Sequence, residues 1–180
     1  MPNPCVALLR GINVGGKNML PMKTLEKMFA DAGCDRVRSY IQSGNVVFRA
    51  NKTLAAKLPD LIGAEILKFS GYRVPVILRT IEQMEETVRN NPYLNKENTV
   101  HLLHVMFLAS RPSQERIDAL DHSRSVPDEF AVLGGEIYLR LPNGTARSKL
   151  TNAYFDSKLV TTSTSRNWRT VNKLVEMMRE

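Results

Sequence analysis

Apolar runs and amphipathic stretches alternate along the first half of the chain in an order that predicts one compact motif. Short apolar runs bounded by turn residues are typical of strands, and apolar residues three or four apart are typical of helices. The predicted elements are a strand at residues 5–10, a helix from Pro21 to Gly33, a hairpin of strands at 37–41 and 46–50, a helix ending at Gly71 and a strand at 74–78. This order, βαββαβ, is that of the ferredoxin-like motif.

The second half repeats the order of elements without any similarity of sequence to the first. A short helix at 81–89, with a capping box of Thr80 and Gln83, ends at Asn90-Asn91-Pro92 and marks the boundary. The elements after it are a strand at 100–109, a helix at 112–120, a hairpin of 130–133 and 137–141, a helix at 150–159, a strand at 160–162 and a last helix. We therefore expect an α+β protein of two consecutive ferredoxin-like subdomains with antiparallel sheets, residues 1–91 and 92–180, plus a C-terminal helix.

The central strand of each half is apolar at successive positions. Residues 5–9 and 102–108 contain almost no polar side chain, whereas a strand with one solvated face alternates apolar and polar residues. Both faces of each sheet should therefore be covered.

The composition narrows the class of protein. Of the 180 residues, 43% are hydrophobic and 24% charged, and no apolar run approaches the roughly 20 residues that cross a bilayer. The start, residues 1–4, lacks the positive segment of a secretory signal, and Cys5 and Cys34 fit a reducing compartment with buried, inert thiols. We expect a cytoplasmic protein with no membrane partner.

The balance of charge is basic, with a formal net charge of +7 and a pI near 9.6. Such an excess fits a phosphate-bearing partner, although many proteins that bind no anion share it. The sequence has no dense run of Lys and Arg, so any preference for anions must come from folded loops.

The loop after the first strand, Gly11–Asn18, nearly matches the P-loop pattern G-x-x-x-x-G-K-[ST]. Asn18 replaces the hydroxyl that coordinates magnesium, Pro21 delays the helix, and no apolar strand ends in an Asp suited to the metal. The antiparallel topology also differs from the parallel core of the NTPases. These departures argue against nucleotide hydrolysis and leave a simpler anion-binding loop.

Two clusters of polar loop residues follow from the topology. In a βαββαβ unit the loop after the first strand and the turn between the second and third lie at the same edge, so Gly11–Asn18 should lie beside Gln42–Asn45. In the second half, the segment before the second helix should approach the end of the last strand. Cations near the helix starts, at Lys17 and Lys23, Arg147 and Lys149, and Arg166 and Arg169, favour anion sites there. The predicted ligand-binding residues are Arg10, Asn13, Gly15, Gly16, Lys17, Asn18, Gln42, Ser43, Asn45, Ser148, Lys149, Thr162, Arg166 and Asn167.

The sequence indicates neither a metal site nor a catalytic constellation. His101 and His104 are three apart on a predicted strand, which sends them to opposite faces, and neither cysteine has the spacing of a metal ligand. Ser43 has no adjoining His or carboxylate, and Trp168 falls on an apolar helical stripe that indicates core packing. We expect no cofactor and no catalytic residue.

Four segments together carry a resemblance to a known family. They are Ala7–Asn18, Tyr40–Phe48, Ser148–Leu150 and Thr164–Thr170, which reads TSRNWRT. The chain resembles, over essentially its full length, the domain-of-unknown-function family numbered sixteen-ninety-seven, a bacterial family. The resemblance implies two ferredoxin-like subdomains and brings no reaction, cofactor or catalytic residue.

The functional hypothesis is that the predicted ligand-binding loops bind a phosphate-containing ligand without catalysis. The ligand would be either a small molecule such as a nucleotide, or a nucleic acid. Two alternatives stay open. One is an enzyme that acts on a small anionic substrate through Lys17 or a Ser/Lys pair. The other is a purely structural role, in which the loops hydrogen-bond to each other.

Overall fold

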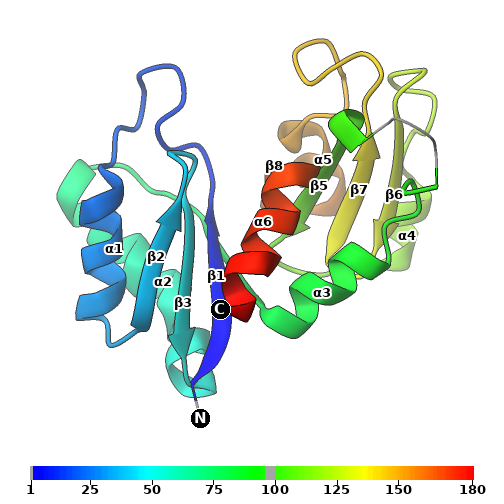
Figure 1. Cartoon of the computed structure of the whole chain (residues 1–180). Helices are drawn as coiled ribbons and strands as arrows, with labels where there is room; N and C mark the ends of the chain where they lie inside the picture. Colours follow the sequence, from blue (N-terminus) through cyan, green and yellow to red (C-terminus); the bar gives the residue numbers. More distant parts are fainter. Residues whose placement is uncertain (1, 96–99) are drawn as a thin grey trace. The chain divides into compact units, whose positions relative to one another are not determined.

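The chain folds around two separate four-stranded antiparallel sheets (Figure 1). The structure is a computed structural model and describes residues 2–95 and 100–180. Contacts between Cα atoms divide the chain into unit 1, Met1–Glu86 with Lys173–Glu180, and unit 2, Thr87–Asn172. Residues 173–180, which the sequence assigns to the second half, therefore group with unit 1.

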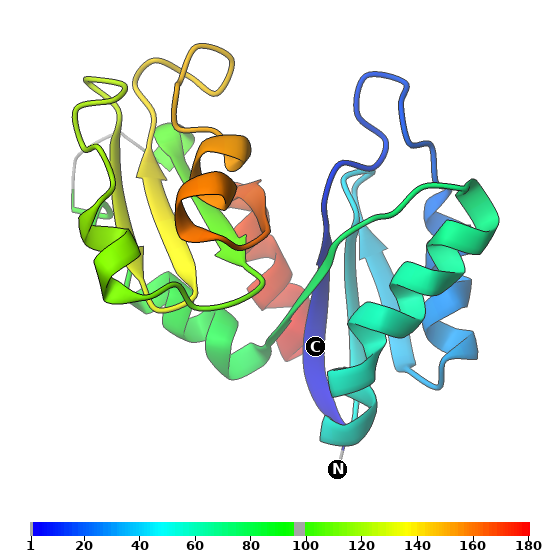
Figure 2. The ribbon, with the colours of Figure 1, turned by 180° about the vertical axis from the view of Figure 1, so that it is seen from behind.

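Unit 1 has the strand order β2-β3-β1-β4, which is that of the ferredoxin-like motif. Helices α1 and α2 cover one face of this sheet (Figure 2) and bury Phe29, Leu58 and Ile62 against Ala7 and Phe48. The elements are β1 (Asn3–Leu9), α1 (Met22–Asp31), β2 (Asp35–Tyr40), β3 (Asn45–Ala50), α2 (Lys52–Ser70), β4 (Val76–Thr80) and α3 (Ile81–Arg89).

Unit 2 repeats this topology with the strand order β6-β7-β5-β8, so the prediction of two ferredoxin-like subdomains is confirmed. Its core packs Phe155 and Leu159 of one helix against Phe130, Ile137 and Leu139 of the sheet. The elements are η1 (Val100–Leu102), β5 (Leu103–Leu108), α4 (Gln114–Asp118), β6 (Glu129–Leu133), β7 (Glu136–Arg140), α5 (Asn152–Leu159), β8 (Ser163–Asn167) and α6 (Trp168–Arg179), of which the residues from Lys173 onward group with unit 1. None of the helices described is long and apolar enough to cross a membrane.

Both faces of the central strands are buried, as the apolar runs predict. Ala7 and Leu9 face the helices, and Leu8 on the opposite face is also 0% exposed. In unit 2, the buried Tyr138 hydroxyl donates a hydrogen bond of 3.1 Å to the backbone oxygen of Thr87. The central strands are therefore covered on both faces.

Two element boundaries in unit 2 differ from the sequence-based prediction. The Thr151 hydroxyl accepts a hydrogen bond of 3.2 Å from the Tyr154 amide, so α5 begins at Asn152, and Arg147 and Lys149 precede the helix instead of opening it. Val160 ends α5 in a left-handed conformation, and the last strand comes after it. Arg166 is therefore a strand residue, and the prediction that it opens the last helix is wrong.

Both cysteines are free and buried, as expected. Burial raises the pKa of the Cys5 thiol and of the Cys34 thiol to about 11. Because the thiolate is the reactive form, both groups are inert at neutral pH.

Candidate functional site

The Gly11–Asn18 loop lies beside the turn between β2 and β3, as the topology predicts (Figure 1). The Asn13 Nδ2 atom donates to the Gln42 backbone oxygen at 2.9 Å and to the Leu20 backbone oxygen at 2.9 Å. Its Oδ1 atom accepts from the Leu20 amide at 2.8 Å. Asn13 has a φ of 53°, in the left-handed region that Asn tolerates better than most residues. One side chain thus joins three backbone groups and fixes the loop.

The tip of this loop is a tight two-residue turn. Gly15 and Gly16 have φ values of 57° and 73°, and the Lys17 amide donates to the Val14 oxygen at 3.0 Å. Successive positive φ values are the signature of a type I′ turn, which explains the two glycines. Asn18 closes the loop, because its Nδ2 atom donates to the Gly11 oxygen at 2.9 Å. The Lys17 side chain is exposed.

The β2–β3 turn is also held by its own polar groups. Asn45 is 0% exposed, and its Nδ2 atom donates to the Tyr40 oxygen at 3.1 Å and to the Ser43 hydroxyl at 3.0 Å. Gln42 is exposed and Arg10, at the end of β1, is half-buried. The amides of Asn13, Asn18 and Asn45 therefore stabilise the loops themselves, which is the structural alternative. Ligand binding by this cluster stays a prediction that rests on Lys17 and the turn.

Ser148 and Lys149 belong to a separate hydrogen-bond network. The Lys149 amide donates to the Ser125 hydroxyl at 3.0 Å, and that hydroxyl donates to Asp128 at 2.8 Å. Ser148 is buried, and its hydroxyl accepts from the Leu150 amide at 3.1 Å. These contacts fix the segment that leads into α5.

Arg166 and Thr162 occupy the last strand and the residues before it. Arg166 is only 7% exposed and donates to the Thr164 hydroxyl and to the Ser165 oxygen, both at 2.8 Å. Burial lowers the pKa of its guanidinium group to about 10. The Thr162 oxygen accepts from the Ala109 amide at 2.8 Å. Arg166 thus acts inside unit 2 and presents little of its charge to solvent.

Asn167 lies at a cavity of about 530 Å³ in unit 2, which we name the histidine cavity. His104 of β5 is the direct partner of Asn167 across the antiparallel pair, so their side chains share a face. The described residues that line the histidine cavity are Val100, His101, His104, Asn167, Trp168 and Arg169.

His101 and His104 both line this cavity, although only His104 belongs to a strand, because residues 100–102 form a 3-10 turn before β5. The alternation of side chains along a strand therefore does not extend back to His101. The prediction that His101 and His104 diverge is therefore wrong. The sequence-based prediction placed both histidines on one strand and so applied the alternation of a strand to His101.

The start of α6 forms one wall of the histidine cavity. The Asn167 Oδ1 atom accepts from the Thr170 amide at 2.8 Å and so caps the helix. Trp168 is 5% exposed, whereas Arg169 and His101 are exposed. The cavity thus combines a guanidinium group, two imidazoles and the positive end of a helix dipole, and no described lining residue is acidic.

His104 is half-buried, and desolvation lowers the pKa of its imidazole. Its Nδ1 atom is 3.4 Å from the Leu102 oxygen. A proton on Nδ1 in that contact leaves Nε2 as an acceptor. Burial thus favours a neutral imidazole that can accept a hydrogen bond or a proton.

This burial makes stability depend on pH. Because the folded state binds the His104 proton less tightly than the unfolded state does, stability falls as pH decreases below the unfolded pKa of about 6.5. We expect the free energy of unfolding of the wild type, measured with urea, to decrease between pH 7.5 and pH 5.5 more than that of His104→Gln. The difference is at most about 1.4 kcal/mol per pH unit. Equal decreases in the two proteins would contradict this account of His104.

The described part of the chain contains no group of three or more His, Cys, Asp or Glu side chains placed to hold a metal ion. The histidine cavity supplies two imidazoles and no carboxylate from its described lining. Its donors suit an anion better than a cation.

Comparison with known proteins supports the fold and leaves the chemistry open. A family model described as "Protein of unknown function (DUF1697)" matches residues 3–138. A conserved bacterial protein, SP0830 from Streptococcus pneumoniae, has a similar structure, with a TM-score of 0.74, 20% sequence identity and coverage of 100% of both chains. No curated protein matches the sequence.

Proposed function

The chain belongs to the DUF1697 family of proteins of unknown function, and on that premise we propose that it binds a phosphate-bearing ligand in the histidine cavity without chemically changing it. The observation that carries the proposal is the position of Arg169 and His101 at the capped start of α6, in one cavity of about 530 Å³. A cavity of that size suits a small molecule of the dimensions of a nucleotide.

Each group of the cavity has a role in this proposal. Backbone amides at a helix start bind phosphate oxygens, and the α6 dipole adds to the attraction. The Arg169 guanidinium group offers two parallel donors to the same group, and His101 offers a further one. His104, held neutral by its burial, accepts a hydrogen bond from a hydroxyl or an amino group of the ligand. Val100 and the edge of Trp168 give apolar contact.

The proposed site keeps Asn167 from the site predicted from the sequence, but it is centred on the histidine cavity and not on the Gly11–Asn18 loop. Asn167 stays in it as the residue that fixes the start of α6, while Arg166 acts from within the unit. Lys17 and the Gly15–Gly16 turn remain a second place for an anion, since the lysine is exposed there. We also propose a cytoplasmic location, which the two free cysteines favour.

Fluorescence of Trp168, the single tryptophan, tests the proposal directly. We expect titration with adenosine 5′-monophosphate, pyrophosphate or a short single-stranded RNA to change the emission until it saturates, with weaker binding at higher salt. Arg169→Met should weaken binding about tenfold, because a hydrogen-bonded charge is lost.

Arg147→Met is the matched control, since Arg147 is an exposed arginine of the same unit that does not line the cavity. Its affinity should equal that of the wild type. The proposal fails if none of the three probes binds, or if the two variants weaken binding equally.

One observation favours an enzyme as the second candidate. The neutral His104 lies in the same cavity as Arg169, and a general base beside an anion-binding group is a common arrangement for acid–base chemistry. Release of phosphate from the bound probe, lost in His104→Gln while binding persists, would replace the binding proposal with this one.

A further inference from the structure

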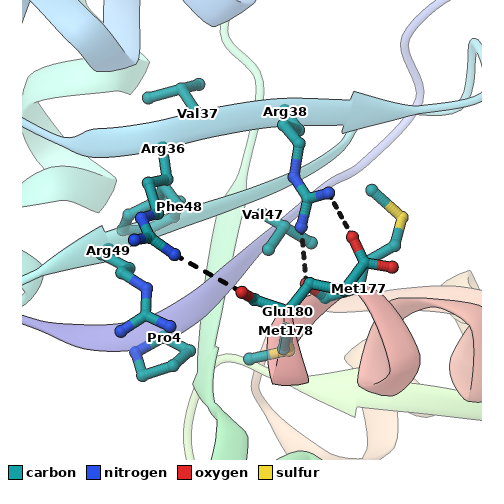
Figure 3. Close-up of a pocket in the computed structure, with 10 residues that line it drawn as sticks. All are labelled: Pro4, Arg36, Val37, Arg38, Val47, Phe48, Arg49, Met177, Met178 and Glu180. Atoms are coloured by element: carbon teal, nitrogen blue, oxygen red, sulfur yellow. Dashed lines mark hydrogen bonds and ion pairs between the residues drawn. The ribbon is translucent and has the colours of Figure 1, made fainter.

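A second cavity, in unit 1, is lined by three arginines (Figure 3). Its volume is about 470 Å³. Arg36 and Arg38 come from β2 and Arg49 comes from β3, and Pro4 and Val47 belong to its apolar wall. We name it the arginine cavity. It shares no residue with the histidine cavity.

β2 contains a bulge beside this cavity. The pairing of β2 with β3 shifts register between Asp35 and Arg38, so two residues of β2 face one residue of β3. Arg36, in the bulge, has a φ of 49°, a conformation that costs a residue with a Cβ atom of order 1 kcal/mol. Arg36 and Arg38 both line the cavity, and the bulge lies between Asp35 and Arg38.

Arg38 is already occupied by the last residues of the chain. Its guanidinium group donates to the Met177 backbone oxygen at 2.7 Å and forms an ion pair with the Glu180 carboxylate (Figure 3). The Met177 oxygen lies in the last turn of α6, where a cation offsets the helix dipole. Arg38 therefore has a structural role in unit 1.

Arg36 and Arg49 are far less engaged. Among the described residues, the Arg36 guanidinium group has one hydrogen-bond partner, the Glu180 main-chain oxygen, at 3.4 Å, which is close to the limit of a hydrogen bond. For the half-buried Arg49 side chain, the described part of the chain provides neither a hydrogen bond nor an ion pair. Glu180 is the one residue with an acidic side chain in the described lining, against three arginines.

We propose that the arginine cavity binds a small organic phosphate monoester, with the phosphate group between Arg36 and Arg49. A phosphate group suits a cavity lined by three arginines, and each guanidinium fork can hold two of its oxygens. Pro4, Val47 and the buried Met178 would contact the apolar body of the ligand. The volume lies within the roughly 300–1,000 Å³ of small-molecule sites.

The arginines have a structural explanation that the experiment must separate from binding. β2 is an edge strand, and charged side chains and bulges protect such edges from pairing with other chains. If this protection is their only role, Arg36 and Arg49 recognise no ligand.

Calorimetric titration of the full-length chain with phenyl phosphate tests the proposal. We expect saturable binding that Arg49→Met and Arg36→Met each weaken at least tenfold, with melting temperatures close to that of the wild type. Arg73→Met, at an exposed arginine of unit 1 outside the cavity, is the control and should bind normally. Arg38→Met should lower the melting temperature, because it removes the contact to the end of α6.

Three outcomes would overturn the proposal. They are the absence of binding to the wild type, equal affinities of Arg49→Met and Arg73→Met, and binding of phthalate in preference to phenyl phosphate. Arg169→Met should leave this binding unchanged, since Arg169 lines the other cavity. The arginine site and the histidine-cavity proposal therefore stand or fall separately.

Discussion

Replacing Gly44 with alanine should lower the free energy of unfolding by about 3 kcal/mol. We expect this to be the largest loss among the substitutions of a glycine by alanine. A Cβ atom at this position would lie 2.8 Å from the Cβ atom of Leu9 and 2.9 Å from the Cδ1 atom of Ile12. Leu9 cannot move away easily, because its amide donates to the Gly44 oxygen at 2.9 Å. Gly44 also has a φ of 81°, which a residue with a side chain adopts at a cost.

Gly71→Ala separates the packing effect from the backbone effect. Gly71 has a nearly equal φ of 78°, but a Cβ atom there meets nothing within 4 Å. We expect a loss of about 1 kcal/mol from the backbone conformation alone. Chemical denaturation of both variants measures the difference. Equal losses would show that the β2–β3 turn has room for a side chain and that the contact with β1 is not tight.

Asn13→Ala should lower the free energy of unfolding by about 2 to 4 kcal/mol. The Asn13 side chain satisfies the amide and the oxygen of Leu20 and the oxygen of Gln42. Without it, the part-buried amide and oxygen of Leu20 lose their partner, and the Gly11–Asn18 loop loses its attachment to the β2–β3 turn. Urea denaturation gives the loss of stability, and hydrogen exchange of the Leu20 amide should accelerate.

Asn18→Ala is the appropriate comparison for this variant. Asn18 has a φ of 52°, against 53° for Asn13, so alanine in this left-handed conformation costs the same free energy in both variants. Its side chain makes one hydrogen bond, to the Gly11 oxygen, at an exposed position. We expect a loss of about 1 kcal/mol. If both variants lost the same stability, Asn13 would not be the residue that fixes the loop.

The order of helices and strands could be predicted from the sequence, because the spacing of apolar residues reflects which side chains are buried. The run at residues 5–9 is apolar on both faces, and the sheet containing β1 is indeed packed on both. The boundaries were less accessible, because they depend on which side chain caps a helix. Thr151 caps α5, although Arg147 and Lys149 precede it, and no periodicity separates these possibilities.

The candidate sites were only partly accessible, since each depends on a local departure from regular geometry. Residues 100–102 form a 3-10 turn where the sequence predicts a strand, and His101 of this turn lines the same cavity as His104 of β5. The bulge in β2 gives Arg36 a positive φ, although arginine has no special tendency to adopt one. Arg166 was predicted to bind a ligand because it is a charged residue of the polar segment Thr164–Thr170. Tertiary packing buries its side chain instead, which the sequence does not indicate.

Two-dimensional 1H–15N NMR of the full-length protein, titrated with adenosine 5′-monophosphate, tests binding in the histidine cavity most directly. The account predicts saturable shifts at the backbone amides of Asn167, Trp168 and Arg169, at the Trp168 indole and at the ring nitrogens of His101 and His104. Arg169→Met should require about tenfold more of the nucleotide for the same shifts. Unchanged signals at these groups, at concentrations that shift signals elsewhere in the chain or shift none, would contradict it.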